Sequence, residues 1–271
     1  MPRTSAPADT VPTADPAPSD SYVQSFARGL AVLRSFGAGD AAAMTLSQAA
    51  DRAGLTRAGA RRILLTLVHL GYVETDGRLF RLTPRVLELG FAYLSSLPVW
   101  HLAQPVMEEL VAEIHESCSA AVLDGHEIVY VLRVPANKIM AINLGTGSRL
   151  PAVSTSMGRV LLAGLDDAAL QARLADAPLV AHTARTVTDR GELLEVIRQV
   201  RRQGWALVNE ELEEGLISVA APIVNRAGRV VAAVNVSGQR NRTPAPQMIE
   251  RLLPRLLATA QRINALMRTQ D

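Results

Sequence analysis

The chain has 271 residues, a formal net charge of +2, 48% hydrophobic residues and a single cysteine. This length allows one large domain or two ordinary ones, and the hydrophobic content is sufficient for a sizeable buried core. No apolar run reaches the roughly 18 residues of a membrane span, and no secretory signal is evident. Because Cys118 has no cysteine partner, we expect no internal disulfide and a reducing, cytoplasmic location.

The charge is unevenly distributed along the chain. Residues 1–20 are rich in Pro, Ala, Ser, Thr and Asp, which predicts a disordered tail. Residues 21–85 carry nine Arg against four acidic side chains, whereas residues 86–271 carry 18 Lys and Arg against 19 Asp and Glu. A short basic part joined to a long neutral part indicates a polyanion-binding module attached to a second module. An ordinary surface with an excess of arginine is the alternative.

The basic part begins with two predicted helices. Apolar residues recur at helical spacing over residues 23–36, and a short helix is expected over residues 46–52, followed by Gly54. Thr56 is suited to cap a third helix. Helices joined by a tight turn that contains glycine predict a helix-turn-helix.

The third helix, within residues 55–73, has the residue distribution of a recognition helix. Its apolar residues fall on one broad face, while its arginines lie off that face near the N-terminal end, the part that contacts base edges in DNA. Arg57 and Arg61 are one turn apart, and each could bind a guanine edge bidentately. A solvated amphipathic helix is the alternative. The residues predicted to contact DNA are Thr56, Arg57, Ala58, Arg61 and Arg62.

A hairpin is expected directly after this helix. Apolar and polar residues alternate around Asp76-Gly77, a strong hairpin signal. A helix-turn-helix followed by a hairpin is a winged helix, whose wing arginines Arg78 and Arg81 would contact phosphate or the minor groove. The helix after Thr83-Pro84 is expected to connect the two modules.

The remaining sequence predicts helices mixed with strands. A long helix is expected after Pro98, over residues 102–118, and turn signals separate consecutive strands at Asp124-Gly125 and at residues 226–228. Another long helix ends at Gly204, and a final helix begins at about Pro244. Hairpins between consecutive strands indicate an antiparallel α+β domain.

Three hydroxyl residues, Ser154, Thr155 and Ser156, precede a predicted helix. The free N–H groups of a helix N-terminus favour a carboxylate, so this position is a candidate binding site. Plain N-capping, which needs only one of the three hydroxyls, is the alternative. These residues alone favour neither interpretation.

Six ordered blocks of sequence resemble the IclR-type bacterial transcription regulators over essentially everything after Asp20. They include GLTRAGARRILLTLVHLGYV, STSMGRVLLAG and VVAAVNVSG, and they are most similar to the Pca/Pob-type branch, which regulates aromatic-acid catabolism. The resemblance implies an N-terminal winged helix-turn-helix, a linker helix and a C-terminal GAF-like effector-binding domain. It also implies a homodimer that pairs into a tetramer on DNA.

Domain boundaries and an effector site follow from this resemblance. We expect a tail at 1–20, a DNA-binding domain at 21–83, a linker helix at 84–97 and an effector domain at 98–271. Together with the three hydroxyls, the expected effector-binding residues are Ile139, Ile142, Ser154, Thr155, Ser156, Met157, Leu216, Ser218, Asn235 and Ser237.

Some of these positions carry information about the ligand. Asn235 and Ser237 are alternate residues of one predicted strand and face the same side, which suits a pocket with a few placed polar groups; a hydrated sheet edge is the alternative. Ser218 stands where some family members have cysteine, and Asn235 where some have serine. Both differences bear on the identity of the ligand. Arg133 or Arg149 could pair with a second carboxylate, although a surface role is expected for both.

Other kinds of site have little support. The five histidines lack metal-ligand spacing, and the acidic run at residues 210–214 is typical of a charged loop, so no metal or other cofactor is expected. A serine hydrolase using Ser154 or Ser156 would need a base, and neither the G-x-S-x-G nor the S-x-x-K pattern is present. An enzyme is therefore not expected. A DNA-architectural protein without a ligand is the second alternative.

The sequence thus predicts a ligand-responsive transcription regulator that binds double-stranded operator DNA and is nucleoid-associated when bound. The branch that it resembles implies a small aromatic or related carboxylic acid as effector, of the protocatechuate, 4-hydroxybenzoate, β-ketoadipate or terephthalate type. Effector binding would bias one of two arrangements of the dimer through the linker helix.

Overall fold

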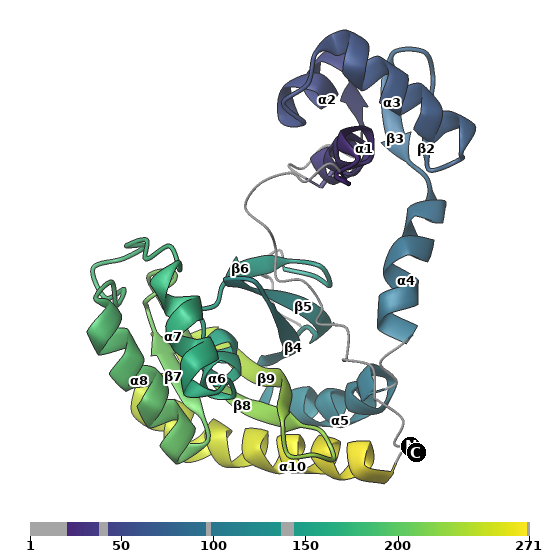
Figure 1. The fold of residues 1–271 in the computed structure, drawn as a ribbon. Helices are drawn as coiled ribbons and strands as arrows, with labels where there is room; N and C mark the ends of the chain where they lie inside the picture. The colour runs from purple at the N-terminus through teal and green to yellow at the C-terminus, as the bar shows by residue number, and fades with distance from the viewer. Residues whose placement is uncertain (1–20, 38–42, 96–98, 137–143, 270–271) are drawn as a thin grey trace, which may run out of the picture. The chain divides into compact units, whose positions relative to one another are not determined.

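The computed structural model describes residues 21–37, 43–95, 99–136 and 144–269. The chain divides into two compact units, residues 1–93 and 94–271, called here unit 1 and unit 2 (Figure 1). The boundary falls inside the helix that was expected to link the two modules. The predicted tail, together with Ile139 and Ile142, lies outside the described residues.

Unit 1 is a winged helix-turn-helix, as predicted. Its elements in chain order are α1 (Gln24–Ser35), β1 (Met44–Thr45), α2 (Leu46–Arg52), α3 (Arg57–His69), β2 (Val73–Thr75), β3 (Leu79–Leu82), a 3-10 turn (Pro84–Val86) and α4 (Leu87–Ser95). The strands form an antiparallel sheet in the order β1-β3-β2. The two-residue strand β1 was not predicted. Its Met44 pairs with Phe80 of the hairpin, and both side chains are buried in the core of the unit.

Local capping fixes where the helices of the turn begin. The Thr45 side chain accepts from the Gln48 backbone N–H, and the Gln48 side chain accepts from the Thr45 N–H, which makes a capping box at α2. The Thr56 hydroxyl accepts from the Gly59 N–H at 3.2 Å and caps α3, as predicted. The start of α3 is therefore defined by side chains next to it in sequence.

The spacing of apolar residues in α1 does not identify its buried face. Val23, Phe26 and Leu30 fall at helical spacing but are 61%, 67% and 36% exposed, whereas Val32 and Phe36 enter the core. The core of unit 1 is built by α2, α3 and the sheet, and these contact only the C-terminal end of α1. Leu33 of the apolar stripe packs against this core, so only the N-terminal part of the stripe is uncovered in a single copy of unit 1.

Unit 2 is built around one six-stranded antiparallel sheet, which confirms the predicted α+β class. Its elements are α5 (Val99–Ile114), β4 (Ser117–Asp124), β5 (Glu127–Val134), β6 (Arg149–Pro151), α6 (Ser156–Ala163), α7 (Asp167–Ala175), α8 (Arg190–Gln203), β7 (Ala206–Asn209), β8 (Leu216–Val224), β9 (Val230–Gln239), α9 (Ala245–Gln247), a π turn (Met248–Leu252) and α10 (Leu253–Thr269). The strand order is β6-β5-β4-β9-β8-β7.

Helices cover both faces of this sheet (Figure 1). One apolar core lies between the sheet and helices α5 and α10, and a second lies between the sheet and helices α6, α7 and α8. Every residue of α6 is buried. A Cβ on Gly158 of α6 would lie 2.0 Å from the Ala152 carbonyl oxygen, so only glycine permits this close approach of the helix to the preceding chain. No helix in the described ranges is long and apolar enough to cross a membrane.

Two helices of unit 2 differ from expectation. The first was expected to continue through Cys118, but it ends at Ile114; His115 takes a positive φ of 56°, and Cys118 is a buried residue of β4. The expected single C-terminal helix contains a π turn at Met248–Leu252, just before Pro254. Proline lacks an N–H and crowds the preceding turn, so the helix widens there rather than continuing in regular α geometry.

Candidate functional site

The N-terminal end of α3 presents cations to solvent. Arg57, Arg61 and Arg62 are exposed, and none forms an ion pair with another described residue. The opposite face of α3 is anchored in the core of unit 1 by Ala60, Leu64 and Leu67. The helix therefore holds three unpaired guanidinium groups on a rigid, solvent-facing surface, which is the arrangement that a major-groove contact needs.

The two wing arginines differ in their surroundings. Arg78 is exposed at the hairpin turn, whereas Arg81 is half-buried on β3 and lies 3.7 Å from the Asp76 carboxylate. The pKa of Asp76 is lowered because the backbone N–H groups of Leu79 and Arg78 donate to its carboxylate, with a further contribution from the positive charge of Arg81. Arg78 is thus the freer of the two for a phosphate.

Arg85, which joins α3 to α4, was not predicted from the sequence. Arg85 lies in the turn before α4, and its Nη1 donates to the Leu70 carbonyl oxygen at 2.9 Å, at the C-terminal end of α3. The guanidinium also lies over the Tyr72 ring, 5.5 Å from its centroid, and 3.5 Å from Glu88 of α4. A cation at the negative end of a helix is stabilising. Arg85 thereby ties the start of α4 to the end of the candidate recognition helix.

In unit 2, most of the predicted effector residues surround one small cavity of about 90 Å³. This inner cavity lies where the N-terminal end of α6 meets the sheet. It is lined by Tyr130, Arg133, Leu144, Leu150, Ser154, Thr155, Ser156, Met157, Val208, Leu212, Glu213, Leu216, Ser218, Asn235 and Ser237. Eight of the ten predicted effector residues are in this set, and the other two, Ile139 and Ile142, lie outside the described residues.

The three hydroxyls before α6 have separate roles. Thr155 is the helix cap, because its Oγ1 accepts from the Gly158 N–H at 3.2 Å and donates to the Pro151 carbonyl oxygen at 3.0 Å. Ser156 instead lies 2.9 Å from the hydroxyl of Ser218 on β8. Capping therefore uses one hydroxyl of the three, which leaves Ser154 and Ser156 as polar groups in the cavity wall.

Two further polar side chains of the cavity are deeply buried. Asn235 is 5% exposed, and its Oδ1 has no hydrogen-bond partner. Tyr130 is also buried, and burial raises the pKa of its phenol, an effect that the positive charge of Arg133 partly offsets. An unpaired acceptor in a buried site is costly unless a ligand or a water donates to it. Asn235 is thus the group of the inner cavity most in need of a partner.

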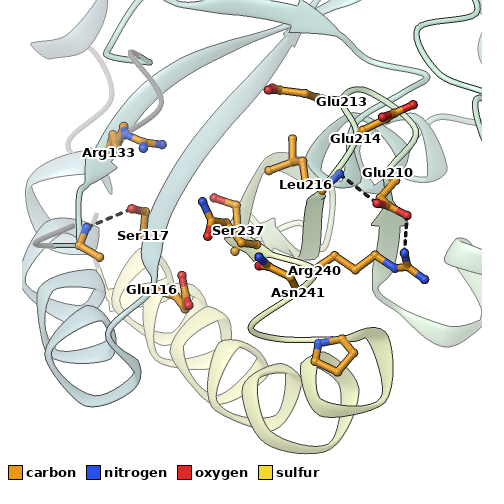
Figure 2. A pocket seen from close by; sticks show the side chains of 15 residues that line it. Glu116, Ser117, Arg133, Glu210, Glu213, Glu214, Leu216, Ser237, Arg240 and Asn241 are labelled. Carbon is orange, nitrogen blue, oxygen red and sulfur yellow. Dashed lines mark hydrogen bonds and ion pairs between the residues drawn. The ribbon is translucent and has the colours of Figure 1, made fainter. Parts of the chain in front are cut away.

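An outer cavity of about 690 Å³ lies next to the inner one and shares Arg133, Glu213, Leu216 and Ser237 with it. Figure 2 shows Arg133 on one wall of the outer cavity and the acidic residues Glu210, Glu213 and Glu214 on the opposite wall. Its volume is in the usual range of small-molecule sites. The two cavities together suit a small ligand held at the inner end and admitted through the outer one.

The loop between β7 and β8 forms the acidic wall and is tightly held. Glu210 has a positive φ of 62°, and its Oε1 accepts from the Gly215 N–H at 2.9 Å. The same carboxylate lies 2.9 Å from Arg240 and 3.3 Å from Arg185. The charged loop expected at residues 210–214 is therefore a structured wall of the cavity.

A buried ion pair joins this loop to α6. Arg159 is 2% exposed; its Nη1 donates to Glu211 Oε1 at 2.7 Å, its Nη2 donates to Glu211 Oε2, and its Nε donates to the Val153 carbonyl oxygen at 3.0 Å. The bidentate geometry satisfies the fork of donors that arginine presents. This pair was not predicted from the sequence. The signal for it was an arginine within an otherwise apolar helix, since a buried charge needs a partner.

Arg133 and Arg149 were both expected on the surface. Arg149 is exposed and binds Asp124 and Glu127 at 2.7 Å each, outside both cavities. Arg133 is half-buried, lines both cavities and forms no ion pair with a described residue; its Nη1 donates to Ser119 Oγ at 3.3 Å. The expectation for Arg133 was wrong, because the curved sheet brings this end of β5 to the mouth of the inner cavity.

A winged helix-turn-helix with unpaired arginines, joined to an α+β unit with a polar, ligand-sized cavity, defines the class of DNA-binding proteins with a separate effector-binding domain. Comparison with known protein families agrees with this class. The IclR helix-turn-helix domain matches residues 25–77, and the bacterial transcriptional regulator IclR C-terminal domain matches residues 91–265. The chain belongs to the IclR family of transcriptional regulators, and the relatives that it matches are named regulators, not enzymes.

The individual relatives include two named regulators and one solved structure. The chain is 43% identical to the Pca regulon regulatory protein of Pseudomonas putida, over 92% of this chain and 84% of that protein. It is 38% identical to the p-hydroxybenzoate hydroxylase transcriptional activator of Acinetobacter baylyi, over 92% and 93%. An IclR homolog from Microbacterium hydrocarbonoxydans, solved in complex with 4-hydroxybenzoate, is 26% identical with a TM-score of 0.80, over 91% of this chain and all of that one.

We predict that Glu211→Gln strongly destabilises unit 2. The substitution keeps the shape of the side chain but leaves Arg159 charged, buried and unpaired, which costs roughly 3–5 kcal/mol. Urea unfolding followed by the fluorescence of Trp100 and Trp205, the two tryptophans of the chain and both in unit 2, measures this change. Glu195→Gln, which removes the exposed partner of Arg198, is the control and should cost no more than about 1 kcal/mol. Equal stability of the two variants would show that the buried pair does not hold the cavity wall.

Proposed function

We propose that this chain is a sequence-specific regulator of an aromatic-acid catabolic operon and that a small aromatic carboxylic acid in the inner cavity controls its binding to operator DNA. The observation that carries the proposal is the single cavity that gathers eight predicted effector residues from α6, β8, β9 and the chain before α6. The names of relatives that act on the Pca regulon and on p-hydroxybenzoate hydroxylase expression support the aromatic-acid pathway.

In this proposal, α3 binds the major groove with Thr56, Arg57, Ala58, Arg61 and Arg62. The wing contacts the DNA backbone with Arg78 and, less freely, with Arg81. The proposed domains are a DNA-binding domain at 21–83, a linker at 84–97 and an effector domain at 98–271, and the division between Tyr93 and Leu94 falls inside the proposed linker. Because Arg85 ties the end of α3 to the start of α4, a displacement of α4 is passed directly to the recognition helix. Effector binding regulates DNA binding only if it favours one arrangement of the helices over the other.

Arg57→Ala combined with Arg61→Ala is predicted to abolish specific DNA binding, because the variant loses two bidentate base contacts worth roughly 1–3 kcal/mol each. Binding is measured by fluorescence anisotropy at fixed salt, on a duplex selected from a random library by the wild-type protein. Arg202→Ala combined with Arg229→Ala removes the same charge from exposed sites of unit 2 and is the control. Retained affinity in the first variant would refute the assignment of α3 as the recognition helix.

Ser156→Ala combined with Asn235→Ala is predicted to shift the effector response without weakening DNA binding. The variant removes two polar groups from the inner cavity, so more acid is needed for the same effect on the DNA complex. The measurement is the dose-response curve of DNA binding against 4-hydroxybenzoate. A curve that superimposes on that of the wild type would place the effector elsewhere.

We further propose that the chain acts as a homodimer, paired into a tetramer on DNA. The exposed apolar residues at the start of α1, Val23, Phe26 and Leu30, together with the preceding Tyr22, support a contact between copies at unit 1, since exposed apolar patches mark interaction surfaces. Phe26→Asp is predicted to shift the assembly toward smaller species in sedimentation velocity. An unchanged sedimentation profile, at protein concentrations around the dissociation midpoint of the wild type, would exclude this stripe from the interface.

A further inference from the structure

The row of residues Arg133, Ser119 and Asn235 crosses three neighbouring strands at the inner cavity. Ser119 of β4 is the register partner both of Arg133 on β5 and of Asn235 on β9. Two strand spacings of about 4.8 Å separate the outer members, so their Cα atoms lie roughly 10 Å apart. Arg133 and Asn235 both line the inner cavity. A ligand in the cavity can therefore contact a cation at one end and a neutral amide at the other.

The cationic end offers one uncommitted charge. Among the described residues, the arginines that line the two cavities are Arg133 and Arg240. Arg240 is paired with Glu210 at 2.9 Å, whereas Arg133 has only the neutral Ser119 hydroxyl as a partner. A half-buried guanidinium beside a cavity is suited to bind a carboxylate bidentately. The site thus has a partner for one carboxylate.

The amide end needs a hydrogen-bond donor. Asn235 Oδ1 is buried and has no partner, and the neighbouring hydroxyls of Ser156 and Ser218 are bonded to each other. A ligand hydroxyl that donates to Oδ1 would satisfy this acceptor, whereas a hydrogen or a halogen would leave it unpaired. A second carboxylate could accept from the amide nitrogen, but it would be buried with no further free cation among the described lining residues to neutralise it.

We propose that the inner cavity selects an aromatic acid with one carboxylate and one ring hydroxyl, the carboxylate bound to Arg133 and the hydroxyl donating to Asn235 Oδ1. This inference rests on the proposed function and narrows it, because it separates hydroxybenzoates from dicarboxylic acids such as terephthalate. Asn235 is the specificity-determining residue, and Arg133 anchors the acid.

The test is isothermal titration calorimetry of the full chain with 4-hydroxybenzoate, benzoate, 4-fluorobenzoate and terephthalate. The expected result is that 4-hydroxybenzoate binds at least about tenfold more tightly than each of the other three, because only it satisfies both ends of the row. 4-Fluorobenzoate has a substituent at the same ring position but no proton to donate. Terephthalate replaces the hydroxyl with a second carboxylate.

Two variants separate the two ends of the row. Asn235→Leu has a similar size but no acceptor, so 4-hydroxybenzoate should lose about tenfold in affinity while benzoate does not, and the preference between them should disappear. Arg133→Met should weaken every acid in the panel and keep the preference for the hydroxyl. Arg149→Met, which removes an exposed arginine outside both cavities, is the matched control and should change neither. Tryptophan fluorescence on urea unfolding checks that each variant is folded.

Each outcome bears on a different claim. Binding of benzoate or terephthalate as tight as that of 4-hydroxybenzoate would overturn the inference but leave an acid-responsive regulator standing. Unchanged affinities in Arg133→Met would overturn the anchoring role and point to the N-terminal end of α6 as the carboxylate site. If no acid of the panel bound at any concentration tested, the effector part of the proposed function would fail, and the inference with it.

Discussion

The buried ion pair between Arg159 and Glu211 holds the two walls of the inner cavity together. Arg159 lies on α6, one turn beyond Ser156, and Glu211 lies in the loop that carries the opposite wall. Two charges removed from water are tolerated only when their geometry satisfies both partners. The bidentate contact and the additional bond to Val153 meet that condition. The pair fixes the loop against the helix, so the cavity exists before a ligand arrives, and less ordering is needed on binding.

The side chains on the sheet face that α6 covers determine where this cavity lies. On the face covered by α6, Ala121, Ala220 and Ala233 are fully buried and allow the helix to approach closely. Further along β8 and β9, toward the N-terminal end of α6, the side chains change to Ser218, Asn235 and Ser237. The apolar packing that seals the rest of the interface thus ends at a group of polar side chains. The core and the candidate site are two parts of one helix-sheet contact.

Features set by residues close in sequence were predictable. The hairpins at Asp76-Gly77 and Asp124-Gly125 and the cap at Thr56 depend on local turn chemistry, and the structure has them where they were expected. The hydroxyls at residues 154–156 were ambiguous, because capping and ligand binding require the same residue types. Only the structure separates Thr155, which caps the helix, from Ser156, which lines the cavity beside Ser218.

Features set by distant residues were not predictable in the same way. Arg159 and Glu211 are 52 positions apart, and the sequence around either residue does not identify the other as its partner. Arg133 resembles a surface arginine until the curvature of the sheet places it at the cavity. The apolar spacing of α1 was informative about helix formation but not about burial, because a helix can present an apolar stripe to another molecule as well as to its own core. Apart from the three hydroxyls at residues 154–156, the predicted effector residues came from the family resemblance rather than from residue chemistry.

The central claim is that occupation of the inner cavity and binding of DNA are energetically coupled. The most direct measurement is the dissociation constant of 4-hydroxybenzoate with and without saturating operator duplex, together with that of the duplex with and without saturating 4-hydroxybenzoate. Thermodynamic linkage requires the same fold-change in both directions, and we expect a change of at least about fivefold. Tight binding of both ligands with neither affecting the other would contradict it, because the cavity would then bind an acid without regulating DNA binding.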